Sequence, residues 1–170
     1  MTLRLRPLAL IGAAVASISM GGGAASPHPA TALSCTLSVA RPSAGARVVT
    51  LSFTLRNGGD RSIAVLGWNT PFDGWFGEYL DVTRDGARVP YEGPVAKRGA
   101  PAADDYLTVR ARGQRTARID LAAAYSLKQA GRYRVTFRGV LHDVRVEGAP
   151  RTSGLEPATL ACGAAEFSVD

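Results

Sequence analysis

Apolar and polar residues alternate along most of this chain. In residues 47–57, RVVTLSFTLRN, the apolar positions from the second valine onward are separated by threonine and serine. Residues 131–137, GRYRVTF, repeat the pattern, with Tyr133, Val135 and Phe137 on the apolar side. A period of two is typical of a β-strand that has one face in a core and the other in water.

Turn signals separate the alternating segments. Asp85-Gly86 between two short apolar runs indicates a hairpin. Residues 121–129, LAAAYSLKQ, are the one stretch that could hold a helical turn. The sequence therefore predicts an all-β fold, an immunoglobulin-like antiparallel β-sandwich of about 7–9 strands. The further expected strands are SIAVLGW (62–68), YLDVT (79–83), ARVPY (87–91), DYLTV (105–109), RTARIDL (115–121), VLHDVRV (140–146) and AEFSV (165–169).

A tyrosine near the start of one expected strand leaves two interpretations open. Gly131 precedes Tyr133 in QAGRYRVTF. This is the arrangement of a tyrosine corner, in which the phenol bonds to the backbone a few residues upstream in immunoglobulin-like sandwiches. The alternative is a tyrosine that only packs in the core.

The first residues are typical of a secretory signal peptide. Arg4 and Arg6 precede an apolar run that is too short to span a membrane, and Ala-Thr-Ala ends at Ala32. We expect residues 1–32 to be removed and residues 33–170 to form one domain without a transmembrane helix, secreted or periplasmic. A cut near Ala25 is an alternative, and lipid anchoring at Cys35 is a weaker one.

The two cysteines lie near the two ends of the expected domain. Because an exported protein meets an oxidising compartment, we expect Cys35 and Cys162 to form a disulfide. Closing so long a loop is worth on the order of 4 kcal/mol in the chain-entropy model.

Charge and motifs argue against catalysis and nucleic-acid binding. The net charge of +6 comes from basic residues that are scattered and not interleaved with aromatics, so nucleic acid is not an expected partner. His142 has no partner at metal-ligand or triad spacing, and neither an HExxH nor a GxSxG motif is present. Pairs of acidic residues such as Asp104 and Asp105 occur, but their spacing does not indicate an acid–base or calcium site. We expect no catalytic residue, no bound metal and no cofactor, and hence no enzyme.

The segment Gly67–Gly77, GWNTPFDGWFG, gathers four large aromatic rings among glycines and a proline. Trp68 ends an alternating strand and is expected in the core. Phe72, Trp75 and Phe76 lie beyond that strand, and one neighbouring face cannot bury them all. The segment is therefore either a cover over the end of the core or a contact surface for a partner. We expect Trp75 to belong to the contact surface.

Three segments in order resemble a known family: GWNTPFDG (67–74), VAKRGAPAADDYLTV (95–109) and IDLAAAYSLKQAGRYRVTF (119–137). Together they are similar to the N-terminal, non-catalytic domain of bacterial deuterolysin-like zinc endopeptidases, the aspzincins that include peptidyl-lysine metalloproteases. In that family the domain is a β-sandwich of the proregion. The resemblance implies a role in assisting folding and in holding the protease inactive.

The resemblance carries no zinc ligand or catalytic residue onto this chain, because the matched segments precede the protease. It implies a surface role for Trp68, Asn69, Thr70 and Pro71, and for Lys97, Arg98 and Gly99. We expect a protein that binds a secreted metallopeptidase in trans as an inhibitor or folding helper. The alternative is an extracellular or envelope adhesion module that binds a glycan or a surface protein. The residues expected to bind the partner are Trp68, Asn69, Thr70, Pro71, Phe72, Trp75, Phe76, Lys97, Arg98 and Gly99.

Overall fold

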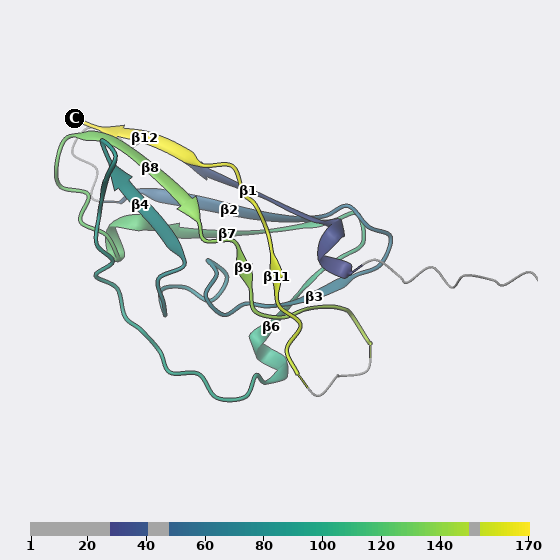
Figure 1. The fold of residues 1–170 in the computed structure, drawn as a ribbon. Coiled ribbons are helices and arrows are strands. Elements are labelled where there is room, and N and C mark those ends of the chain that lie inside the picture. The colour runs from purple at the N-terminus through teal and green to yellow at the C-terminus, as the bar shows by residue number, and fades with distance from the viewer. Residues whose placement is uncertain (1–27, 41–47, 150–153) are drawn as a thin grey trace, which may run out of the picture.

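The computed structural model describes residues 28–40, 48–149 and 154–170. These residues form twelve β-strands and three short 3-10 turns, and they contain no α-helix (Figure 1). All paired strands are antiparallel, apart from an isolated parallel bridge at the cysteines. The predicted all-β fold is confirmed.

The first sheet consists of β1 (Leu33–Val39), β2 (Thr50–Asn57) and β7 (Gln114–Asp120), in the order β1-β2-β7. Its register places Phe53 between Leu37 of β1 and Ala117 of β7. Because side chains alternate between faces, this register turns the apolar residues of β1 and β2 to one side.

The second sheet consists of β12 (Ala165–Val169), β8 (Gly131–Phe137), β4 (Leu80–Arg84) and β5 (Ala87–Arg88), in that order. The ribbon of β8 lies between those of β4 and β12 in Figure 1. The hairpin between β4 and β5 turns at Asp85-Gly86, as the sequence predicts.

Two smaller sheets complete the fold. β10 (Val144–Val146), β3 (Ile63–Leu66) and β6 (Tyr106–Val109) form a three-stranded sheet in this order. β9 (Val140–Leu141) pairs with β11 (Ala158–Thr159). The strand number exceeds the expected 7–9 because two-residue pairings such as β9 and β11 count as strands of their own.

The core lies between the two larger sheets. The ring of Phe53 on β2 is 5.2 Å from that of Phe137 on β8, so the sheets pack face to face. Leu51, Leu55 and Val135 are fully buried beside them. Residues between these on the same strands face outward, which confirms the predicted alternation. Two packed antiparallel sheets fit a sandwich; its immunoglobulin-like class stays a prediction.

Tyr133 makes the hydrogen bond of a tyrosine corner. Its ring is fully buried, and its hydroxyl donates to the backbone oxygen of Gln129 over 2.7 Å. Gly131 has a φ of +147°, a conformation that side-chain-bearing residues rarely adopt. The structure therefore decides between the two interpretations of this tyrosine and fixes the segment that enters β8.

The predicted disulfide between Cys35 and Cys162 is present. The Cα atoms are 5.0 Å apart, and 127 residues separate the two cysteines in sequence. The bond joins β1 to the segment that leads into β12. A cysteine in a disulfide has no free thiol, so the lipid anchor considered for Cys35 does not fit this structure.

Residues 1–27, which hold most of the expected signal peptide, lie outside the described residues. Pro29–Ala32 form the 3-10 turn η1, and the oxygen of Ala32 accepts the N–H of Gly58 over 2.8 Å. A cut near Ala25 would keep this contact, whereas a cut after Ala32 would remove it together with the turn η1. Within the described ranges, no helix has the length and apolar composition needed to cross a bilayer.

Candidate binding site at the aromatic loop

The segment Gly67–Gly77, here called the aromatic loop, follows β3 and is folded by its own polar atoms. The N–H of Gly67 donates to the oxygen of Asp105 over 2.8 Å. The hydroxyl of Thr70 donates to the oxygen of Gly67 over 2.5 Å and accepts the N–H of Phe72 over 3.2 Å. These bonds make a compact turn at the end of the strand, as expected of Thr in turns.

Burial corrects part of the expected contact surface. Thr70 is fully buried and Pro71 is buried beside it. The surface role that the resemblance implies for these two residues does not fit the structure, because a partner cannot reach them. Asn69 is half-buried; it has a φ of 54°, and its amide nitrogen lies 3.0 Å from Nε2 of His142. This contact ties the loop to the segment after β9.

Trp68 is 8% exposed, so it is buried as the alternation predicts, and the surface role that the resemblance implies for it does not fit the structure. It lies outside the core between the large sheets. Its indole N–H donates to the carboxylate of Asp105 over 2.9 Å. The guanidinium of Arg98 lies 5.3 Å from the ring centre of Trp68 and 5.2 Å from that of Phe76. Arg98 also forms an ion pair with Asp73. Two charged side chains, Asp105 and Arg98, therefore contact this tryptophan.

The two carboxylates of this region are shifted in opposite directions. Burial raises the pKa of Asp73 above its ordinary value, and the positive charge of Arg98 only partly offsets this. The N–H of Ala102 and then the indole N–H of Trp68 lower the pKa of Asp105, because they bond to its ionised form.

Trp75 packs against the fold, which corrects the expectation that it belongs to an exposed contact surface. Its ring is half-buried and stacks on that of Tyr79, with centroids 5.2 Å apart and an interplanar angle of 9°. It also contacts Tyr91 and Tyr125, with centroid distances of 6.1 and 5.8 Å. Its indole N–H donates to the oxygen of Asp120 over 3.0 Å.

Of the two interpretations of the loop, Phe72 fits a cover over the core and Phe76 fits a contact surface. The edge of Phe72 meets the ring of Phe53 in the core, with centroids 5.5 Å apart. Phe76, in contrast, is 45% exposed. The loop is therefore a cover over the core at Phe72 and Trp75 and an accessible surface at Phe76.

A second exposed segment lies against Phe76. The N–H of Ala96 donates to the oxygen of Phe76 over 3.0 Å, which brings the segment from Pro94 to Gly99 alongside the loop. Val95 is 77% exposed, and Lys97, Arg98 and Gly99 are classed as exposed. The structure thus brings together the two groups of residues that the sequence singled out separately.

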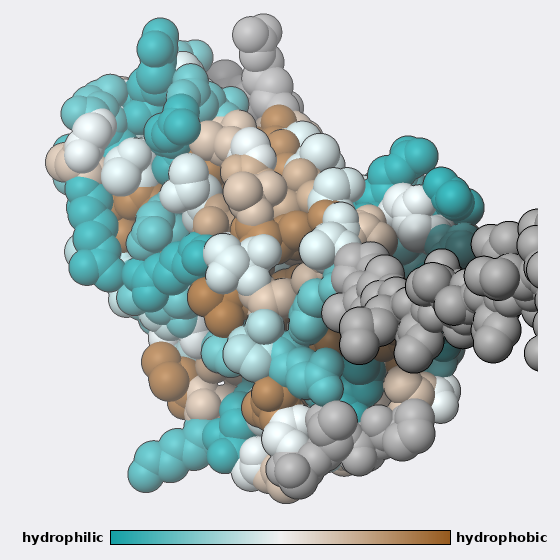
Figure 2. All heavy atoms as spheres, turned by 45° about the vertical axis from the view of Figure 1, so that its right-hand side comes forward, coloured by the Kyte–Doolittle hydropathy of each residue, from teal (hydrophilic) through white to brown (hydrophobic). Residues whose placement is uncertain are grey.

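We call Phe76, Val95, Lys97 and Arg98 the Phe76 surface. Sequence reasoning missed Val95; the available signal was a lone branched apolar residue between glycine, proline and charged residues in EGPVAKRG. On the face drawn in Figure 2, apolar residues reach the surface in areas bordered by hydrophilic ones. An exposed ring, an aliphatic side chain and two cations can bind a partner, but they supply no nucleophile.

The described part of the chain contains no group of three or more His, Cys, Asp or Glu side chains placed to hold a metal ion. His142 contacts Asn69, and the buried Asp143 forms an ion pair with Arg145 and accepts the hydroxyl of Tyr106 over 2.5 Å. These polar residues bind one another within the fold. The expectation that the chain is not an enzyme stays a prediction.

No protein-family model matches the chain. It is 29% identical over 146 residues to an extracellular protease of Aeromonas hydrophila. The match covers 86% of this chain and 38% of that protein, so the chain spans well under half of its relative's length. The chain is thus similar, over most of its own length, to part of an extracellular protease.

Proposed function

We propose that this chain is a secreted, non-catalytic module that binds a peptidase, either as an inhibitor or as a folding helper. The observation that carries the proposal is the similarity to 38% of an extracellular protease over 86% of this chain. In such a protein, a module of this kind lies in the same chain as the remaining part of the protease, so that part is the first partner to consider for this chain. A disulfide between the first and last parts of the fold suits an extracellular location.

The Phe76 surface is the contact that we assign to this role. Phe76 is 45% exposed and stands on a loop that is bonded to Asp105 at Gly67 and closed on itself by the bond from Thr70 to Gly67. A rigid support lowers the entropy lost on binding, and exposed aromatic and arginine side chains are typical of binding hot spots. The resemblance to deuterolysin-like proregions, which implies a metallopeptidase partner, points to the same residues 97–99.

The charges on this surface favour a partner with acidic groups. Arg98 is already paired with Asp73, and its guanidinium lies near the rings of Phe76 and Trp68. Lys97 is exposed and forms no ion pair within the described ranges. A free lysine beside an exposed ring allows an ion pair at the rim of an apolar contact, which adds specificity and association rate.

The test uses the purified extracellular protease of Aeromonas hydrophila and the purified chain. We expect measurable binding by biolayer interferometry, together with slower casein cleavage or a higher recovery of activity after dilution from urea. Phe76→Ala should weaken binding about tenfold or more, as loss of a ring at a hot spot does. Val140→Ala is the control, because Val140 is 43% exposed and belongs to β9.

The proposal would be contradicted if the chain does not bind the protease and changes neither its casein cleavage nor its recovery of activity after urea. Binding of the chain to chitin, cellulose or peptidoglycan in place of the protease would support the adhesion alternative. If Phe76→Ala and Val140→Ala weaken binding equally, the chain binds the peptidase but not through the Phe76 surface.

A further inference from the structure

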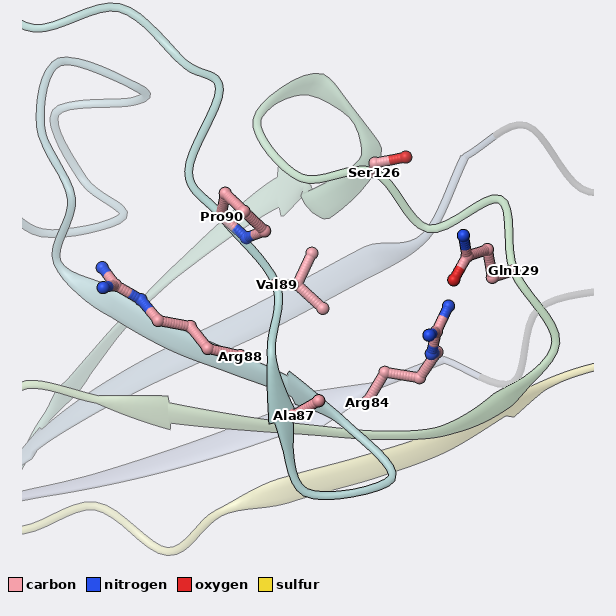
Figure 3. Close-up of a pocket in the computed structure, with 7 residues that line it drawn as sticks. All are labelled: Arg84, Ala87, Arg88, Val89, Pro90, Ser126 and Gln129. Atoms are coloured by element: carbon pink, nitrogen blue, oxygen red, sulfur yellow. The ribbon is translucent and has the colours of Figure 1, made fainter.

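A shallow cleft of about 160 Å³ lies between the β4–β5 hairpin and the segment before β8 (Figure 3), and none of its lining residues belongs to the Phe76 surface. Val89 and Pro90 provide apolar surface in it, and Ser126 and Gln129 provide polar groups on the opposite segment. Arg84 and Arg88 stand on different sides of Val89 in the close-up. The cleft thus combines an apolar floor with hydrogen-bond donors.

Arg84 differs from the other arginines of the described ranges. It is half-buried, and its guanidinium forms no ion pair or hydrogen bond within these ranges. The other half-buried arginine, Arg145, is paired with Asp143, and the arginines that lack an acidic partner are exposed to water. Arg88, across the cleft, is already paired with Glu78 over 2.6 Å. A guanidinium that has lost part of its water without gaining an anion is poised to bind one.

The fold holds Arg84 and Gln129 in place. A Cβ atom at Gly131 would come within 2.9 Å of Cγ of Arg84, so the arginine stem lies directly over this glycine. The hydroxyl of Tyr133 binds the oxygen of Gln129, which fixes the backbone of the facing segment. The side chains of Arg84 and Gln129 point toward one another in Figure 3. The carboxylate of Asp85 accepts the N–H of Arg132 over 3.0 Å and is thereby directed to the backbone of β8.

We propose that this cleft binds a carboxylate group of a peptide together with the carbon atoms next to it. The carboxylate would pair with the guanidinium of Arg84, whose planar fork matches its two oxygens. The Gln129 amide and the Ser126 hydroxyl supply further polar groups in the cleft. The carbon atoms next to the carboxylate would lie on Ala87, Val89 and Pro90.

A carboxylate fits this site better than a phosphate. Arg84 is the single guanidinium of the cleft that has no acidic partner, because Arg88 is neutralised by Glu78. A doubly charged phosphate would meet one available cation and an apolar floor. A carboxylate needs one guanidinium, and the floor can bury the carbon atoms next to it.

The carboxylate could be the C-terminus of a peptide or the side chain of an acidic residue. N-acetyl-L-valine represents the first source, and N-acetyl-L-aspartic acid α-amide represents the second. N-acetyl-L-valinamide keeps the apolar body of the first probe but has no charge, and inorganic phosphate is the competing anion.

The experiment titrates each probe into the full purified chain and follows amide signals by ¹H–¹⁵N NMR. We expect a carboxylate probe to shift the signals of Val89 and Gln129 with a Kd on the order of 1 mM, as suits so small a ligand. Arg84→Gln should weaken this binding at least tenfold, and Arg84→Lys should weaken it less. Arg115→Gln is the control, because Arg115 is an exposed arginine on β7 that has no ion-pair partner within the described ranges.

The stronger of the two carboxylate probes identifies the source. The proposal is overturned if neither probe shifts these signals, if the valinamide or phosphate binds as well as they do, or if Arg84→Gln and Arg115→Gln have equal effects. None of these outcomes depends on peptidase binding by the Phe76 surface, so the two proposals fail separately.

Discussion

The two ends of the aromatic loop each hold one tryptophan, and the two tryptophans are buried in opposite ways. Trp68 is only 8% exposed, lies outside the main core cluster and contacts two charged groups, the carboxylate of Asp105 and the guanidinium of Arg98. Trp75 is half-exposed, yet it packs on the aromatic rings that continue the core, chief among them Tyr79.

The difference shows that the exposed fraction of a ring does not report what the ring stabilises. Trp68 lies outside the main core and contacts two charged groups that water can solvate in its absence, whereas Trp75 packs on three tyrosines. The free energy of burial depends on the apolar area removed from water on both partners. We therefore expect the more exposed tryptophan to contribute more to the free energy of unfolding.

The largest expected effect is the loss of stability when either tryptophan is removed. Trp75→Ala should lower the free energy of unfolding by about 3 kcal/mol, and Trp68→Ala should lower it by about 2 kcal/mol. Urea denaturation followed by circular dichroism measures both. Phe76→Ala is the control and should change stability by less than about 0.5 kcal/mol, because its ring is 45% exposed. An unchanged stability of Trp75→Ala would restore the sequence-based expectation that this ring serves a partner.

A smaller effect is expected at the arginine that covers Trp68. Arg98→Ala should lower the free energy of unfolding by about 1 kcal/mol, since it removes a half-buried ion pair and the cation–π contacts with Trp68 and Phe76. In a Trp75→Phe background, the fluorescence of Trp68 should become more accessible to acrylamide. Arg88→Ala removes the ion pair to Glu78 without touching a tryptophan, so it should leave the quenching unchanged. Equal quenching in the two variants would show that Arg98 does not shield Trp68.

The smallest expected effect is a difference in proton affinity near Trp68. Asp105 should titrate below the ordinary range of aspartate and Asp73 above it, in ¹³C NMR of the carboxyl carbons. The lowered pKa of Asp105 contributes stability that is present above its unfolded-state pKa and is lost as the pH falls through the folded-state pKa. The raised pKa of Asp73 acts with the opposite sign: its contribution is present below the unfolded-state pKa and is lost as the pH rises through the folded-state pKa.

Two variants sharpen this titration. Trp68→Phe removes the indole N–H and should move the pKa of Asp105 back toward its ordinary value. Arg98→Gln removes a charge that lowers the pKa of Asp73 and should raise that pKa further. Identical titration of Asp73 and Asp105 would argue against the arrangement of these side chains around Trp68.

Much of the framework could be predicted because the signals are local. The alternation around Phe53 and Tyr133 places their rings in the core, and the structure confirms it. Glycine two residues before Tyr133 indicates the corner, and the disulfide follows from two cysteines in an exported chain. The candidate surface was predictable in part: Phe76 and residues 97–99 are exposed, while Thr70 and Pro71 are buried.

The sequence by itself determined which strand residues face inward, because the two-residue period of an extended backbone acts over neighbouring positions. The tertiary structure alone decided the state of the loop rings and of Arg84. Trp75 is held by the oxygen of Asp120, 45 residues away, and Arg84 lies over Gly131. No local pattern encodes such pairs, since they form only when segments distant in the chain are brought together by the packing of the two sheets.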